Sequence, residues 1–152
     1  MVFRKKEMTW IFNGKPITET DIPTNAVGFV YIISTPENKK YLGRKLLTLA
    51  AYKQVNGKRK KLRKPSDWEN YWSSSPDLLA LIEETGTVGY VREIILFCSN
   101  KTLLNYSETT LQHRFRVLES DEWLNRNISM KFFKKFIIGK PEIKKLEEIC
   151  KT

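Results

Sequence analysis

The sequence predicts a small α+β domain, with a mainly antiparallel three-stranded sheet flanked by helices. Three β-rich runs supply the strands: Gly28 to Ser34, Lys40 to Leu46 and Val88 to Ser99. Only Thr35-Pro36-Glu37-Asn38-Lys39 separates the first two runs, and so short a connection indicates an antiparallel pair. Apolar periodicity over residues 77–84 and 100–118 predicts two helices. The length of 152 residues fits one domain, residues 1–152, with a core at about 26–128.

Two segments add to this core. Residues 1–25 form an N-terminal extension in which Asn13-Gly14, between Phe12 and Ile17, predicts a hairpin. Residues 44–64 contain nine basic residues and no acidic residue, with Asn56-Gly57 as a turn signal. The repulsion between these charges should keep the segment in solvent, so we expect a hairpin-like basic loop insertion.

The helices carry recognisable end signals. Ser75 suits the N-cap, Pro76 the first helical position and Gly86 the C-terminal stop. Ser99 or Asn100 caps a longer helix that is expected to reach about Leu118. A further helix is expected from Pro141 to Lys151, within a basic helical extension over 129–152. The chain shows no internal repeat and no linker.

The amino-acid composition favours some classes of function and argues against others. The net charge of +10 and a pI near 9.6 favour a polyanionic partner, foremost nucleic acid. No apolar run is long enough for a membrane span, and the N-terminus lacks a signal core, so we expect a cytoplasmic protein. Two distant cysteines and one histidine argue against a zinc site or a disulfide scaffold, and they fit a reducing compartment.

One carboxylate stands out in the pattern. Five residues with spacings of 4, 3, 4 and 3 draw a single helical stripe: Leu104, Glu108, Leu111, Phe115 and Leu118. A carboxylate on an apolar stripe is costly unless it pairs with an arginine, lies at the stripe's edge or binds a cation. His113 points almost opposite to Glu108, so we expect it to be exposed, and it is a candidate DNA contact.

Several short motifs then occur in a recognisable order. They are Trp10-x-x-Asn13-Gly14-Lys15, Gly28-Phe29-Val30-Tyr31, Tyr41-Leu42-Gly43-Arg44-Lys45, Asp67-Trp68 with Tyr71 and Ser73-Ser74, and Asn105-Tyr106-x-Glu108. Together they resemble the GIY-YIG endonuclease family, most closely its phage-encoded, homing-type members. The resemblance covers roughly residues 9–128. Phe29 departs from the family's usual glycine, although Gly28 lies just before it.

The resemblance implies roles for particular residues. Tyr31 and Tyr41 would form the tyrosine pair at the scissile phosphate, and Glu108 would be the single protein ligand of Mg²⁺ or Mn²⁺. Asn125 would support the active-site arrangement, with Asn127 as a competitor. The basic insertion obscures the position of the family's arginine. Arg44, Arg59 and Arg63 are candidates; Arg44 with Lys45 is preferred and Arg63 is the alternative.

The resemblance implies a metal-dependent DNA endonuclease that hydrolyses phosphodiester bonds, encoded by a phage or mobile element and acting in the host-cell cytoplasm. The expected partner is double-stranded DNA, bound by a monomer or a DNA-assembled dimer. The expected DNA-contacting residues are Lys58, Arg59, Lys60, Lys61, Arg63, Lys64, Trp68 and His113. The alternative is a non-catalytic nucleic-acid-binding protein on a degenerate scaffold of this family. A basic structural or ribosome-associated protein is a third interpretation, which leaves Glu108 unexplained.

Overall fold

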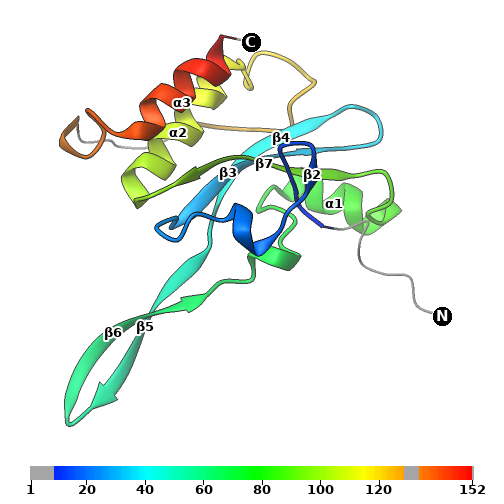
Figure 1. Ribbon diagram of the computed structural model, residues 1–152. Coiled ribbons are helices and arrows are strands. Elements are labelled where there is room, and N and C mark those ends of the chain that lie inside the picture. The colour runs from blue at the N-terminus through cyan, green and yellow to red at the C-terminus, as the bar shows by residue number, and fades with distance from the viewer. Residues whose placement is uncertain (1–8, 129–133, 152) are drawn as a thin grey trace.

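A five-stranded mixed sheet in the order β2-β1-β7-β3-β4 forms the body of the molecule (Figure 1). The computed structural model describes residues 9–128 and 134–151. The strands of the sheet are β1 (Ile11–Phe12), β2 (Lys15–Pro16), β3 (Gly28–Ser34), β4 (Lys40–Leu46) and β7 (Val91–Cys98). Both β3 and β4 have the bounds expected from the sequence, and they pair in antiparallel register from Gly28↔Leu46 to Ser34↔Lys40.

The sequence predicted a three-stranded sheet, whereas the main sheet of the structure has five strands. The Asn13-Gly14 hairpin forms as expected, but its first strand also pairs in parallel with β7, through Ile11↔Glu93 and Phe12↔Ile94. The central trio β7-β3-β4 is antiparallel, as expected. The N-terminal hairpin is therefore part of the main sheet. Strands of two residues give little periodicity, so the pairing of β1 with β7 could not be predicted from the sequence.

The described residues form three α-helices: α1 (Pro76–Thr85), α2 (Lys101–Arg114) and α3 (Pro141–Cys150). Ser75 Oγ accepts a hydrogen bond from the Leu78 N–H, as expected for the N-cap of α1. The expected end of α2 at Leu118 is wrong. Arg116 adopts a left-handed φ of 55°, which an α-helix does not tolerate, and its guanidinium pairs with Glu119 at 2.7 Å. Leu118 consequently leaves the stripe and is 49% exposed.

Two apolar clusters cover the two faces of the sheet. Alternation along β3 sends Phe29, Tyr31 and Ile33 to one face, where they pack with Trp10 and with Leu78 of α1. Val30 faces the other side and packs with buried leucines of β4, α2 and α3: Leu42, Leu103, Leu104, Leu111 and Leu146. Figure 1 shows α2 and α3 together above the sheet, with α1 lying apart from them. Among the described residues, no helix is long and apolar enough to cross a membrane.

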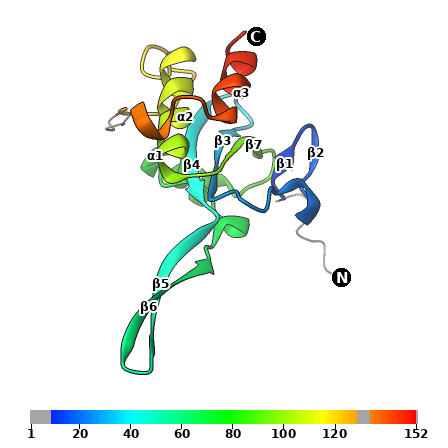
Figure 2. The ribbon, with the colours of Figure 1, turned by 60° about the vertical axis from the view of Figure 1, so that its left-hand side comes forward.

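The basic insertion is a separate β-hairpin. Strands β5 (Thr48–Val55) and β6 (Lys58–Pro65) pair along eight positions and form their own two-stranded sheet. Asn56 and Gly57 turn the chain with φ of 52° and 75°, the left-handed pair that a tight hairpin turn requires. Figures 1 and 2 show this hairpin projecting away from the body, joined to it just after β4. Residues 1–8 and 129–133, which include parts of both expected terminal extensions, lie outside the described residues.

Candidate active site

The predicted catalytic residues Tyr31, Tyr41, Arg44 and Glu108 line one hollow beside β4, the last strand at one edge of the sheet. Alternation places Tyr41, Gly43 and Lys45 on the face covered by α1, opposite Ile33, Tyr31 and Phe29 of β3. It places Leu42 and Arg44 on the face covered by α2. Groups from both faces of the sheet can therefore meet only around this edge.

The tyrosine pair straddles Gly43. Tyr31 lies directly opposite Gly43 in the β3–β4 register, and the ring centroids of Tyr31 and Tyr41 are 6.2 Å apart. A Cβ atom at position 43 would lie 2.6 Å from Tyr31 Oη and 2.8 Å from Tyr41 Cε1. The absence of a side chain at Gly43 is what lets both rings occupy this place.

Both phenols are protonated at neutral pH, and burial moves their pKa values further from neutrality. Burial raises the pKa of Tyr31 well above its ordinary value of 10, and the neighbouring Tyr71 and Tyr41 raise it further. Burial also raises the pKa of Tyr41, against the opposing effects of a hydrogen bond with Ser74 and of the Arg44 charge. Both residues therefore enter the site as neutral hydrogen-bonding groups.

A loop before α1 completes the tyrosine cluster. The ring of Tyr71 stands edge-on to Tyr31, with centroids 6.0 Å apart. The next residues bend sharply: Ser73 has a φ of 103°, and its buried Oγ accepts a hydrogen bond from the Ser75 N–H at 2.8 Å. Arg92 of β7 fixes the loop by donating to the carbonyls of Glu69 and Tyr71. Tyr71 and Ser74 belong to a motif that carried the family resemblance, but neither was assigned a role in the site, since an aperiodic loop does not show which side chains it presents.

On the opposite face, Arg44 meets Glu108 of α2. Arg44 Nε and Glu108 Oε1 are 3.4 Å apart, and the side chains are 30% and 14% exposed. The two groups form an ion pair but no hydrogen bond joins these atoms, since Arg44 Nε is buried without a hydrogen-bond partner. Burial raises the pKa of Glu108, although the Arg44 guanidinium and main-chain N–H both oppose that shift. The Glu108 carboxylate that interrupts the apolar stripe thus lies mostly buried, next to the Arg44 guanidinium.

Two adjoining hollows at this edge share four lining residues: Tyr41, Arg44, Ser74 and Glu108. One of about 300 Å³ also reaches Tyr31, Lys45 and Tyr71. The other, of about 400 Å³, extends along α2 to Gln112 and past Asn125 to Asn127. Each hollow thus brings a phenol, a guanidinium and a carboxylate to one space.

Asn125 holds the edge of β4. Its Nδ2 donates to the Leu42 carbonyl at 2.8 Å, and its Oδ1 accepts from the Leu42 N–H at 3.1 Å. The segment before it continues the pairing, with Lys40 N–H donating to Glu122 and Leu124 N–H donating to Lys40. Asn125 therefore positions the strand that carries Tyr41 and Arg44, while Asn127 lines the larger hollow.

The remaining predicted residues lie around or away from this centre. Lys45 pairs with Asp67 at 2.6 Å and lies 4.0 Å from the centre of the Tyr71 ring. Arg59 and Arg63 are on β6 and line neither hollow, so Arg44 alone of the three arginine candidates lies beside Glu108. The half-buried Trp68 packs against Phe29, with centroids 6.0 Å apart. The lysines of β6 are exposed, as is His113.

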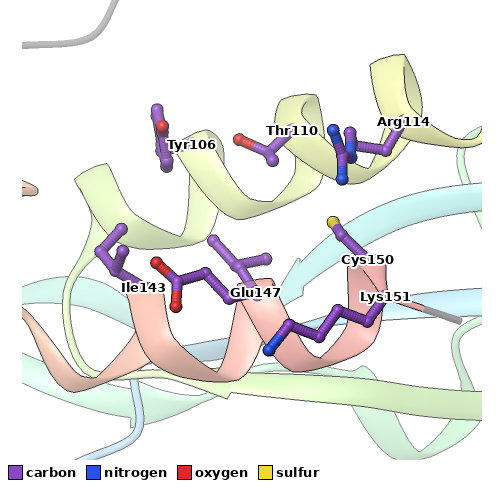
Figure 3. A pocket seen from close by; sticks show the side chains of 8 residues that line it. Tyr106, Thr110, Arg114, Ile143, Glu147, Cys150 and Lys151 are labelled. Atoms are coloured by element: carbon purple, nitrogen blue, oxygen red, sulfur yellow. The ribbon is translucent and has the colours of Figure 1, made fainter.

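A further hollow of about 440 Å³ lies between α2 and α3, and neither Tyr31 nor Tyr41 lines it (Figure 3). Tyr106, Thr110 and Arg114 line it from α2, and Glu147 and Lys151 lie across from them. None of the predicted site residues lines it. The chemistry-bearing residues therefore point to the edge of β4 rather than to this groove.

A comparison with protein families gives an independent result. The family model described as "Putative endonuclease segE, GIY-YIG domain" matches residues 10–128. The chain belongs to this family. The match to this phage-associated GIY-YIG family confirms the resemblance drawn from the motifs, and it spans every residue of the tyrosine cluster together with Arg44, Glu108 and Asn125. The comparison with curated proteins found no match, and neither did the comparison with solved structures.

The site offers a divalent metal ion one carboxylate. Within residues 9–128 and 134–151, no group of three or more acidic, histidine or cysteine side chains is placed to hold a metal. Glu108 nevertheless lines both hollows, and its carboxylate lies 3.4 Å from Arg44 Nε without a hydrogen bond between these two atoms. Such a donor fits Mg²⁺ or Mn²⁺, because Mg²⁺ commonly keeps several waters and takes only one or two protein carboxylates beside substrate phosphate oxygens.

Proposed function

We propose that this GIY-YIG protein is a metal-dependent endonuclease of phage or mobile-element origin that hydrolyses phosphodiester bonds in double-stranded DNA. The observation that carries the proposal is the convergence of Tyr41, Arg44 and Glu108 on one hollow at the edge of β4. Family membership supports a nuclease with a DNA substrate. The net charge of +10 supports a polyanionic partner.

Hydrolysis needs a water molecule to attack phosphorus, a proton to leave that water, and the P–O bond to the leaving oxygen to break. Arg44 offsets the negative charge that builds up on the phosphoryl oxygens. Tyr41, protonated and open to the hollow, donates a hydrogen bond to the phosphate. Glu108 would hold Mg²⁺ or Mn²⁺, which supplies Lewis-acid stabilisation of the leaving oxygen.

Tyr31 lies deeper, and its raised pKa makes a standing phenolate base unfavourable. We assign it a proton relay in which its hydroxyl oxygen takes the proton of the attacking water while its own proton passes to Tyr71 and on to solvent in the smaller hollow. Lys45 adds a second positive charge at the rim of the smaller hollow. Phe29, where the family usually has glycine, is completely buried and packs edge-on to Trp10, so this departure changes the core rather than the site.

The test is cleavage of supercoiled plasmid with Mg²⁺ or Mn²⁺, with EDTA as the metal-free control. Glu108→Gln keeps the shape of the side chain and removes its charge. Glu119→Gln is the matched control, because Glu119 is exposed and pairs only with Arg116 outside the site. We expect nicked or linear product from the wild type and from Glu119→Gln, and none from Glu108→Gln or in EDTA.

A wild type that binds plasmid but leaves it uncut under all metal conditions would favour the non-catalytic binding protein. Cleavage by Glu108→Gln at the wild-type rate would remove Glu108 from the metal site while leaving the nuclease assignment intact. Sedimentation of the protein alone and on DNA would separate a monomer from a dimer assembled on the substrate.

A further inference from the structure

The projecting β5–β6 hairpin has two chemically different faces. Directly opposed residues of an antiparallel pair share a face, so the register assigns every side chain. One face carries Tyr52, Gln54, Arg59, Lys61 and Arg63, and we call it the arginine face. The other, the lysine face, carries Lys53, Lys58, Lys60 and Lys64 among the apolar Leu49, Ala51, Val55 and Leu62. Both arginines of the hairpin thus lie on one side, and four of its five lysines lie on the other.

Both arginines contact other residues of the hairpin that lie on the same face. The Arg59 guanidinium lies 3.9 Å from the centre of the Tyr52 ring. Stacking uses the flat surface of the guanidinium and leaves its N–H donors pointing outward in the plane. Arg63 donates from Nε and Nη2 to Thr48 at the base of the hairpin, at 2.9 Å and 2.7 Å. Two arginines oriented in this way, beside a glutamine, are suited to planar hydrogen-bonding partners.

The dimensions of the hairpin match one groove of DNA. Its strands of eight residues extend about 26 Å at roughly 3.3 Å per residue. The major groove, about 12 Å wide, admits a two-stranded ribbon, whereas the minor groove, about 6 Å wide, does not. Every residue of β6 is exposed, and the ribbon stands clear of the body in two views (Figures 1 and 2).

We propose that the β5–β6 hairpin enters the major groove with its arginine face on the base edges, where Arg59 and Arg63 read guanine, and with its lysine face at the level of the phosphates. Arginine makes paired hydrogen bonds to guanine N7 and O6, and both atoms lie in the major groove. The lysine face then lies near the groove rim, about 8.5 Å above the floor, where flexible ammonium groups neutralise phosphates without reading sequence. This inference rests on the proposed DNA substrate.

The experiment measures binding without cleavage. Duplexes are selected from a randomised pool by the wild-type protein in EDTA, and each guanine of the preferred sequence is replaced singly by 7-deazaguanine or by inosine. The first replacement removes the major-groove N7 acceptor, and the second removes the minor-groove amino group. We expect at least one position where 7-deazaguanine weakens binding about fivefold or more. Inosine at the same position should change the affinity less than about twofold.

Two variants separate the faces. Arg59→Lys keeps the charge but loses the planar fork that stacks on Tyr52, so it should shrink the penalty for 7-deazaguanine at one position while leaving the salt dependence unchanged. Lys60→Ala, on the lysine face, should keep that penalty and lower the slope of log affinity against log salt concentration by about 0.9. Both sites are exposed on a hairpin outside the core, so neither variant should alter folding.

Three outcomes would overturn the inference: selection without a preferred sequence, sensitivity to inosine instead of 7-deazaguanine, or equal losses of base discrimination in both variants. The plasmid assay reports separately on the nuclease. Cleavage without a 7-deazaguanine effect refutes only the groove assignment. The 7-deazaguanine effect without cleavage refutes only the catalytic proposal.

Discussion

Substituting Gly43 with alanine tests whether the packing of the tyrosine pair controls the chemistry. The new Cβ would lie 2.6 Å from Tyr31 Oη, which is 0.8 Å inside the 3.4 Å at which ordinary contact begins. Neighbouring rings confine Tyr31, because it is 1% exposed and its ring packs against Trp10 and Tyr71. Relief therefore requires a shift of Tyr31, of Tyr41 or of the β4 backbone.

The Gly43→Ala substitution should affect both the stability of the fold and the rate of cleavage. Overpacking of this kind typically lowers the free energy of unfolding by about 1–3 kcal/mol. A displacement of about 1 Å at a reacting group costs about 100-fold in rate, or about 2.7 kcal/mol in the activation barrier. We expect Gly43→Ala to remain folded at 25 °C and to cleave plasmid about 100-fold more slowly than the wild type.

Leu146→Ala provides the matched control. Leu146 is 4% exposed on α3, away from the tyrosines, and its truncation should cost about 2–5 kcal/mol in stability. Denaturant unfolding measures stability, and single-turnover cleavage measures the rate. If Gly43→Ala cuts within about threefold of wild type, or if Leu146→Ala loses as much rate while folded, then the reasoning on tyrosine packing is refuted.

Three further predictions follow from the buried charges and thiols. Burial raises the pKa of Glu108 above its unfolded value, so this group favours folding at low pH, and that contribution is lost as the pH rises through the folded pKa. The wild type should therefore lose more stability than Glu108→Gln between pH 4 and pH 7. A wild-type urea midpoint that falls no further than that of Glu108→Gln over this range would contradict the prediction. Burial favours the protonated form of Glu142, but hydrogen bonds from the Ser99 hydroxyl and N–H outweigh it and lower the pKa of this carboxyl. Glu142→Ala should cost about 1.5–3 kcal/mol at pH 7 by urea unfolding, and the deficit should shrink as the pH falls through the folded pKa; a deficit that persists at pH 2 would contradict the charged bond. Burial raises the pKa of the Cys98 thiol to about 12, whereas Cys150 is half-buried, so a thiol reagent should titrate one cysteine in the native protein and two in guanidinium; two fast native thiols would show that the core around Cys98 opens.

Local signals made part of the fold predictable. The strands β3 and β4 have unbroken β-rich runs, and α1 has a serine cap, a proline at its first position and a glycine stop, so their bounds followed from nearby residues. The end of α2 did not, because the apolar stripe continues to Leu118 while the backbone turns at Arg116. The pairing of β1 with β7 joins residues some 80 positions apart through two short strands, and no local pattern encodes such a contact.

The same distinction applies to the site. Glu108 could be proposed as a candidate site residue from the sequence because a carboxylate interrupts an apolar stripe. Tyr31 and Tyr41 could be proposed because they stand in family motifs. The position of Arg44 beside Glu108 depends on how α2 packs against β4, and of the three arginine candidates only Arg44 lies beside Glu108. Tyr71 was not legible as a site residue, since its place beside Tyr31 depends on the bend at Ser73 and on the Arg92 contacts.

The position of the site at an edge strand follows from the alternation of side chains. Tyr41 and Arg44 leave β4 on opposite faces, so in a central strand the sheet itself would keep them apart. Asn125 and the residues before it close the edge of β4 as far as Leu42, and the hollows open beside Arg44. The chain then runs directly from β4 into the basic hairpin. A duplex held by that hairpin would therefore be presented to the one stretch of strand where a phenol, a guanidinium and a carboxylate can reach the same phosphate.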